Sequence, residues 1–285
     1  MTNPSSLSRH SVSVGRKLRP SARLQDDDVE DDTWPTTLAF PKADPAMVQA
    51  LTESLAPRLD DLAEPYTLQW FLTIEERRFG RRGRWLVDLL EFAKHAGETV
   101  LGIGDGMGTD WLQYARHGAN VIVSQARAVD LNLVRRNFEL REISARFLQS
   151  LPTHIPLPNE SVDVICVEGL LHRLDETEAV VAEMFRLLKP GGKVLALVPA
   201  RVTPIASWLR KMPGPAREHC FSRRQLRQLF GSFIEPSVYK RHITRRNYWW
   251  LCRWIPRPVL ERLCGEQLLL KAFKPIQAQA LRLAA

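Results

Sequence analysis

A run of glycines after a short apolar segment is the pattern in this sequence that is best suited to bind a ligand. Gly104, Gly106 and Gly108 alternate with other residues, between an apolar stretch at 99–103 and a helical pattern from about 109. Glycines let the backbone adopt positive φ and let a ligand approach without meeting Cβ atoms. The N–H groups that open the following helix then face that ligand. The spacing alone is a weak signal, because a closely packed turn between a strand and a helix gives the same pattern.

Cysteine usage points away from metal and disulfide chemistry. The four cysteines at 166, 220, 252 and 264 form no Cys-x-x-Cys pair, and no grouping of His, Asp and Glu has metal-ligand spacing. We therefore expect no metal site and a reducing, cytoplasmic setting. Residues 1–24 lack the apolar core of a signal peptide, and no apolar run approaches the ~20 residues that span a bilayer.

Apolar segments alternate with helical ones from residue 98 onward, which is typical of a parallel sheet covered on both faces. Such a sheet would bring the glycine turn and the ends of the neighbouring strands to one edge. We predict helices over 109–116 and 222–230, and others through 129–134 and 180–188. We predict strands at 99–103, 120–124, 145–149, 161–167, 193–199, 238–243 and 267–273.

Composition divides the chain into segments. The formal charge is +8, yet residues 201–285 hold 17 Lys and Arg against four Asp and Glu. The Ser-, Arg- and Pro-rich start and its acidic run at 26–32 are typical of disorder. We expect a disordered tail at 1–44, a helical lid or cap segment at 45–97, and a core at 98–275. The core would carry a basic aromatic insertion at about 244–265, and a C-terminal tail would occupy 276–285.

One part of the cap segment mixes aromatic and charged residues. Residues 66–79 read YTLQWFLTIEERRF, and this pattern fits a helix packed before the core or a lid over a pocket.

Five linked motifs follow one another along the chain: VLGIGDGMG at 100–108, LPNESVDV at 157–164, GLLHR at 169–173, EMFRLLKPGG at 183–192 and FSRRQL at 221–226. With these motifs the chain resembles the class I S-adenosylmethionine-dependent methyltransferases, and within them the small-molecule group known as type 11. The likeness covers about residues 65–275. It implies a Rossmann-like α/β fold, with a seven-stranded, mostly parallel sheet, an antiparallel last strand at about 267–273 and helices on both faces. Ligands of such sheets bind beyond the carboxyl ends of the strands, where the strand order reverses.

The resemblance implies S-adenosylmethionine as the cofactor, but three family positions for acidic residues are changed. They are Gly102 in the glycine motif, Gln125 at the end of the second strand and Leu151 after the third. The amide of Gln125 can accept one hydrogen bond and donate another, so we expect it to hold the ribose less tightly than a carboxylate would. The cofactor-binding residues implied are Gly104, Asp105, Gly106, Gly108, Gln125, Ala126, Leu151 and Glu168.

Methyl transfer requires an acceptor held in line with the sulfonium, and sometimes a base. His172, just beyond the fourth strand, is our candidate base, and Glu168, at the end of that strand, is our candidate to touch the cofactor or the acceptor. A turn histidine and a solvated carboxylate are the alternatives. We expect Asp163 and His154 to be structural or exposed.

The stretch 240–258 interleaves arginines with tryptophans. Trp favours interfaces between apolar and wet phases, and Arg is attracted to anionic lipid, so a peripheral membrane or lipid contact is one interpretation. The other is an insertion that packs its aromatics over the substrate pocket while its arginines face water. Nucleic acid is a disfavoured partner, because no recognised binding module is present. No feature of the sequence indicates an oligomeric state.

Two functions therefore stay open. The first is an S-adenosylmethionine-dependent methyltransferase that acts on a small acceptor. A hydrophobic acceptor is one option. The alternative is a non-catalytic binding or scaffold protein of the same fold with weakened or lost cofactor binding. Each missing carboxylate would cost on the order of 1–3 kcal/mol of binding, so the changes at Gly102, Gln125 and Leu151 separate the two.

Overall fold

The structure is a computed structural model that describes residues 64–80, 83–104, 106–201, 203–209, 220–242, 249 and 254–276. The chain divides into two compact units, Met1–Pro45 and Ala46–Ala285, and all described residues belong to the second. The expected tail at 1–44 and most of 243–253 and of the C-terminal tail lie outside the described residues. Within the described ranges, no helix is long and apolar enough to cross a membrane.

Seven strands and a series of short helices make up the second unit. The strands are β1 (Thr99–Gly104), β2 (Asn120–Gln125), β3 (Arg146–Gln149), β4 (Val162–Glu168), β5 (Leu188–Pro199), β6 (Ile234–Arg241) and β7 (Gln267–Phe273). The helices are α2 (Leu68–Phe79), α3 (Arg84–Leu90), α4 (Thr109–Arg116), α5 (Ala128–Glu139), α6 (Thr177–Leu187), α7 (Pro204–Leu209), α8 (Arg223–Leu229) and α9 (Arg257–Cys264), with two 3-10 turns, η1 (Phe92–His95) and η2 (Leu171–Arg173).

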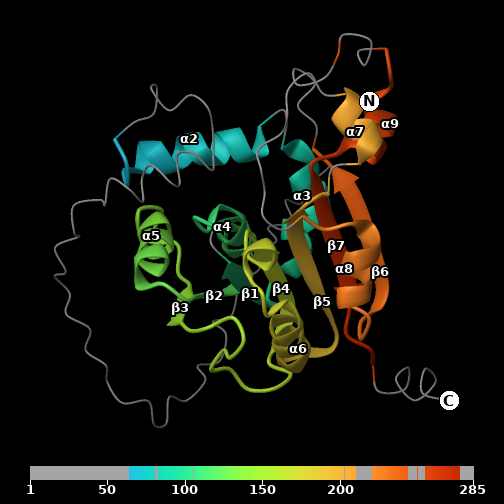
Figure 1. Ribbon diagram of the computed structural model, residues 1–285. Coiled ribbons are helices and arrows are strands. Elements are labelled where there is room, and N and C mark those ends of the chain that lie inside the picture. The colour runs from blue at the N-terminus through green and yellow to red at the C-terminus, as the bar shows by residue number, and fades with distance from the viewer. Residues whose placement is uncertain are drawn as a thin grey trace, which may run out of the picture. The chain divides into compact units, whose positions relative to one another are not determined.

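The strands form one sheet in the order β3-β2-β1-β4-β5-β7-β6 (Figure 1). Neighbouring strands from β3 to β5 are parallel, whereas β7 lies antiparallel between β5 and β6. The predicted fold class, with its antiparallel last strand, is confirmed. Because β1, β2 and β4 are parallel, their carboxyl ends lie at one edge of the sheet, and the strand order reverses there between β1 and β4.

Both faces of the sheet are buried, which explains why its strands read as continuous apolar runs. In β4, for example, Ile165 faces a core shared with α6 and α8, and Val164 faces a second core shared with α3, α4 and α5. Both side chains are at most 1% exposed.

Most predicted boundaries lie within two residues of the observed ones, and those of α4 and β7 agree to the residue. Two strands begin earlier than predicted because each contains a register shift. β5 already pairs with β4 at Leu188, before the bulge, and β6 begins at Ile234 rather than 238. The short helices α7 and α9 are not predicted by apolar spacing.

The aromatic and charged segment of the cap forms α2, which begins after the N-cap Thr67. Its buried residues Trp70, Phe71 and Ile74 pack against Met107 of the glycine turn and Leu133 of α5. Figure 1 shows α2 crossing above α4 and α5 at the carboxyl edge of the sheet. The segment is therefore a packed helix that also covers the glycine turn.

Candidate functional site

The glycine turn passes directly over the end of β4. Gly104 lies opposite Glu168 in the pairing of β1 with β4 and has φ of +144°. A Cβ atom at this position would lie 1.8 Å from the Glu168 carbonyl oxygen, so only glycine fits. Two residues further along the turn, a Cβ at Gly106 would lie 2.9 Å from Glu168 Oε2. The glycine turn and the Glu168 carboxylate are therefore in close contact at the end of β4.

Two amide side chains hold the carbonyl groups of this turn. Gln125 Nε2 donates to the Gly106 carbonyl at 3.0 Å, and Asn137 Nδ2 donates to the Met107 carbonyl at 2.9 Å. Gln125 Oε1 is buried and has no hydrogen-bond partner among the described residues. A buried acceptor without a partner is costly, so this oxygen fits a ligand hydroxyl beside the turn.

Three charged side chains meet at the same edge, and we call them the Arg78 cluster: Arg78 of α2, Asp110 of α4 and Glu168 of β4. Arg78 Nε donates to Asp110 Oδ1 at 2.6 Å, and Arg78 Nη2 donates to Asp110 Oδ2 at 2.5 Å. The same Nη2 lies 2.6 Å from Glu168 Oε1. A single guanidinium thus joins the covering helix to the ends of two core elements.

Burial sets the electrostatics of the Arg78 cluster. The side chain of Asp110 is 1% exposed, that of Glu168 17% and that of Arg78 20%. Burial raises the pKa of the Glu168 carboxyl to about 7; the Arg78 guanidinium opposes this rise, and the Asp110 charge adds to it. Burial alone would lower the pKa of Arg78, but the charges of Asp110 and Glu168 raise it above its ordinary value. Near neutral pH, Glu168 is therefore poised between its neutral and charged forms.

The missing acidic residue at position 102 has a steric explanation. A Cβ atom on Gly102 would lie 2.5 Å from the indole ring of Trp111. Trp111 is fully buried, and its Nε1 donates to the Cys166 carbonyl at 3.2 Å. The indole ring therefore takes the space that a side chain at 102 would need, and the nearby carboxylates come instead from Asp110 and Glu168.

The ends of β2 and β3 present apolar side chains beside Gln125. Ala126 is exposed, and Leu151 is 63% exposed. The two strand ends are joined by a hydrogen bond of 2.7 Å between Ser124 Oγ and Ser150 Oγ. This edge can receive the flat face of a ring, but it contains no carboxylate at 151.

The predicted site residues divide into three groups. Gly104, Gly106, Gln125 and Glu168 lie together around the turn, and Gly108, with φ of +73°, caps the start of α4. His172 lies on η2, four residues beyond Glu168, at the same edge of the sheet. Asp105 lies outside the described residues.

Asp163 and His154 have the structural or exposed roles expected of them. Asp163 accepts from the Thr99 N–H at 2.9 Å and from Lys189 at 2.8 Å. His154 is exposed.

Sequence reasoning missed Arg78 and Asp110. They are 32 residues apart, and each occupies a helix end where its charge suits the helix dipole. The available signal was the position of Asp110, in the first turn directly after the glycine motif.

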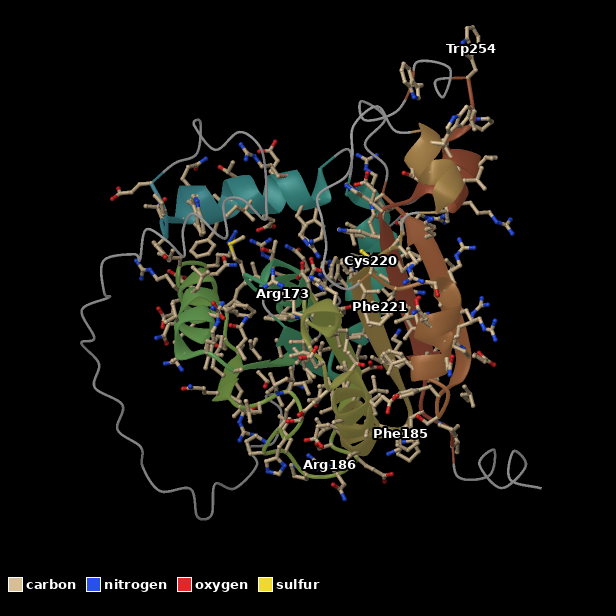
Figure 2. The ribbon with its side chains drawn as sticks, viewed as in Figure 1. Arg173, Phe185, Arg186, Cys220, Phe221 and Trp254 are labelled. Atoms are coloured by element: carbon tan, nitrogen blue, oxygen red, sulfur yellow. The ribbon has the colours of Figure 1, made fainter. Side chains whose placement is uncertain are left out.

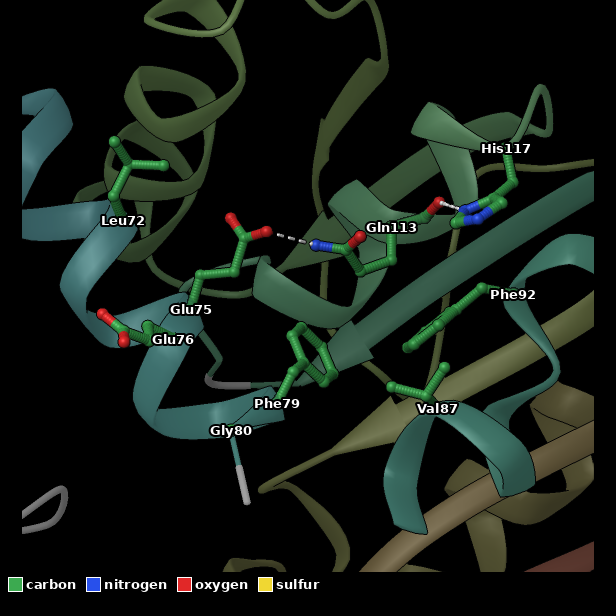
Figure 3. Close-up of a pocket in the computed structure, with 9 residues that line it drawn as sticks. All are labelled: Leu72, Glu75, Glu76, Phe79, Gly80, Val87, Phe92, Gln113 and His117. Carbon is green, nitrogen blue, oxygen red and sulfur yellow. Dashed lines mark hydrogen bonds between the residues drawn. The ribbon is translucent and has the colours of Figure 1, made fainter. Parts of the chain in front are cut away.

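A hollow of about 530 Å³ lies between α2, α3 and α4 (Figure 3). Glu75 lines it and accepts from Gln113 at 2.8 Å, and it also pairs with Arg116 and Arg141. None of its described lining residues belongs to the glycine turn, so this hollow is separate from the Arg78 cluster. Its ion pairs fasten α2 to α4 and to the end of α5.

Comparison with known proteins supports the family resemblance. Residues 100–196, about a third of the chain, match the model of a methyltransferase domain. A demethylmenaquinone methyltransferase from Renibacterium salmoninarum is 27% identical over 146 residues, which cover 50% of this chain and 57% of that protein. The chain thus spans little more than half the length of this curated relative.

Solved structures share the fold at low identity. A SAM dependent methyltransferase from Aquifex aeolicus has a TM-score of 0.52 at 17% identity and covers 81% of this chain and 99% of its own. The [4+2]-cyclase SpnF has a TM-score of 0.53 at 16% identity and covers 81% of this chain and 93% of its own. The fold is that of class I S-adenosylmethionine-dependent methyltransferases, as the sequence motifs predict. The fold alone does not fix the reaction, since one of these neighbours is named a cyclase.

The contact between Gly102 and Trp111 predicts that the family's acidic residue cannot be restored here. We expect Gly102→Asp to lower the stability by at least about 3 kcal/mol, because it overpacks the indole ring and buries a charge. Thermal or urea unfolding measures this loss. Ser232→Asp, in an exposed position after α8, adds a carboxylate without a new Cβ; it is the control and should change stability little.

Trp111→Ala alone leaves a large cavity, so the two substitutions should be strongly non-additive in the double variant. Full stability of Gly102→Asp with Trp111 in place would contradict this packing explanation.

Proposed function

We propose that this protein transfers a methyl group from S-adenosylmethionine to a small hydrophobic acceptor of the quinol type. The Arg78 cluster carries the proposal. The amino-acid end of the cofactor bears one carboxylate and one ammonium, and the cluster offers a guanidinium beside two carboxylates. The methyltransferase-domain match and the name of the Renibacterium relative support the reaction class and the kind of acceptor.

The geometry of Arg78 leaves part of its guanidinium for a ligand. Its contacts with Asp110 and Glu168 use Nε and Nη2, and Nη1 makes no hydrogen bond within the described part of the chain. We assign Nη1 to the cofactor carboxylate and the Glu168 carboxylate to the ammonium. With two carboxylates and one guanidinium, the Arg78 cluster carries a net negative charge, which would then also balance the positive charge of the sulfonium.

The adenosine half would lie along the ends of β2 and β3. The unpartnered Gln125 Oε1 is suited to accept from a ribose hydroxyl, and the exposed Ala126 and Leu151 are suited to flank the adenine ring. Gly106 keeps the space beside the Glu168 carboxylate free of a side chain, and Gly104 and Gly108 let the turn pass close to β4 and α5. Asp105 remains a sequence prediction. With an amide at 125 and no carboxylate at 151, we expect weaker binding than the family pattern gives.

When bound, the cofactor supplies an electrophilic methyl group on a sulfonium. The chain's own residues would position the acceptor, exclude water and move a proton. The buried aromatic face of α2 keeps water from the glycine turn. His172 is the candidate base that removes a proton from the acceptor, and Glu168 holds charge next to the reacting centre.

Removing the Arg78 guanidinium should weaken cofactor binding. We expect Arg78→Met to raise the Kd of S-adenosylmethionine by about 10- to 100-fold, because a charge-assisted hydrogen bond contributes about 1.5–3 kcal/mol. Titration calorimetry measures the Kd. Arg77→Met changes the neighbouring, exposed arginine and should leave the Kd unaltered. Absence of binding to the unmodified protein at roughly 1 mM would contradict the proposed function.

The pKa of Glu168 predicts a pH dependence of cofactor binding. A carboxyl with a pKa of about 7 is neutral below that pH, so it attracts the cationic cofactor less. We expect the affinity to fall by about fivefold between pH 7 and pH 6 and to rise by no more than about twofold above pH 7. Glu168→Gln should bind weakly and show no such dependence. An equal pH dependence in this variant would assign the titration to another group.

His172 should affect turnover rather than cofactor binding. With a demethylated, short-chain quinol as acceptor, we expect His172→Ala to lower kcat by about 100- to 10,000-fold, as is typical for loss of a general base. Its Kd for S-adenosylmethionine should stay within about twofold, since His172 holds no part of the cofactor in this proposal. His117→Asn, at the exposed end of α4, is the control. Unchanged kcat in His172→Ala would remove its role as base.

A further inference from the structure

The elements α7 and α9 form a small layer of their own beside the last strands of the sheet. Ala206, Leu260 and Cys264 make a separate apolar core there, with Ile255 packed against it. Lys240 of β6 donates to the Leu263 carbonyl at the end of α9 at 2.8 Å, which ties this layer to the sheet. The layer is therefore a fixed part of the surface.

Its outer side exposes large apolar residues. Trp208 is 79% exposed and Trp254 83%, and on α9 Val259 and Leu263 are 48% and 40% exposed. In Figure 2 the side chain of Trp254 points away from the body of the protein. Of the tryptophans that the structure describes, those exposed by half or more all lie in 208–254, the region of this layer. Water does not favour such a grouping on a surface, which suggests a partner phase.

A cluster of arginines adjoins these apolar residues. A hollow of about 400 Å³ between α8, β6 and α9 is lined by Arg223, Arg241 and Arg262, and no carboxylate is among its described lining residues. Burial, and then the charges of Arg262, Arg227 and Arg241, lower the pKa of Arg223. Like charges gathered without a carboxylate are stabilised by an anion.

Apolar and basic groups share one helix here, since α9 carries Val259, Arg262 and Leu263. Tryptophan prefers the boundary between lipid and water, and arginine pairs with phosphate at that boundary. We propose that the outer side of α7 and α9, together with the arginine hollow, docks on an anionic phospholipid membrane. A nucleic acid would engage the arginines but would leave Val259 and Leu263 without an apolar partner.

The docking surface lies at the same edge of the sheet as the candidate site. β6 and β5 are both antiparallel to β7, so β6 runs parallel to β4 and ends at the edge where Glu168 lies. Figure 1 shows α7, α9 and α2 along that edge. Docking would therefore turn the cofactor edge toward the membrane, where a hydrophobic acceptor would be dissolved. The proposal itself does not depend on cofactor binding.

Vesicle co-sedimentation of the full chain, without cofactor, tests the docking surface. Vesicles of phosphatidylcholine with about a third phosphatidylglycerol should bind the protein, vesicles of phosphatidylcholine alone should bind it much less, and about 0.5 M salt should release it. The triple variant Arg223→Gln, Arg241→Gln, Arg262→Gln should lower the partition coefficient by about 100-fold. Trp254→Ala, in a residue that makes little contact with the core, should lower it by about fivefold.

The matched control removes three exposed basic side chains elsewhere, by Arg84→Gln, Lys94→Gln and Arg146→Gln. If this control binds as poorly as the first triple variant, the attraction is general and the proposed surface is wrong. Equal binding to neutral and anionic vesicles would also overturn the proposal. The proposal would also be wrong if the protein does not bind vesicles but is stabilised by inorganic phosphate through the same three arginines. Binding of a single-stranded oligonucleotide through these arginines, without vesicle binding, would contradict it as well. Circular dichroism and thermal unfolding confirm that each variant is folded.

Discussion

The bidentate pair between Arg78 and Asp110 is the contact on which the rest of the site depends. A carboxylate that is 1% exposed cannot stay charged without a close partner, and Arg78 supplies that partner from a helix outside the sheet. The pair links α2 to α4 and brings the guanidinium to Glu168, while the apolar face of α2 and the ion pairs of Glu75 hold the helix over the glycine turn independently of Arg78. Loss of Arg78 would therefore leave two buried carboxylates side by side.

The surroundings of this pair also explain two departures from the family pattern, the missing carboxylates at positions 102 and 125. The space beside Gly102 belongs to Trp111, and the amide of Gln125 holds the turn through the Gly106 carbonyl. The carboxyl edge of the sheet still carries negative charge, because Asp110 and Glu168 provide carboxylates there. The chain thus keeps a charged site next to the glycine turn, with its carboxylates on different elements. That arrangement favours a protein that binds a zwitterionic ligand at this edge over a scaffold protein that binds no cofactor there.

The sequence predicts what depends on local pattern. The strands, α4 and the glycine turn follow from apolar runs, a helix period and positions that only glycine can occupy. The family resemblance implies the seven-stranded sheet with its antiparallel last strand. The bulges in β5 and β6 are not predictable in this way, since a register shift breaks the alternation that marks a strand. The end of α3 at its C-cap Glu91, which has φ of +56°, is likewise not predictable from apolar spacing.

The candidate site is predictable only in part for the same reason. Gly104, Gln125 and Glu168 come to one edge because parallel strands align their carboxyl ends. Arg78 and Asp110 meet through tertiary packing alone, and both read as ordinary residues at helix ends. The space next to Gly102 likewise depends on the rotamer of Trp111, nine positions later in the chain.

The central claim is that the Arg78 cluster binds the amino-acid end of S-adenosylmethionine. The most direct measurement compares S-adenosylhomocysteine with 5′-methylthioadenosine, which lacks that end, by calorimetric titration of the unmodified protein and of Arg78→Met. If the claim is right, the variant loses about 10- to 100-fold in affinity for S-adenosylhomocysteine and keeps its affinity for methylthioadenosine. An equal loss for both ligands would contradict it, because Arg78 would then act through the placement of α2 and not through contact with the ligand.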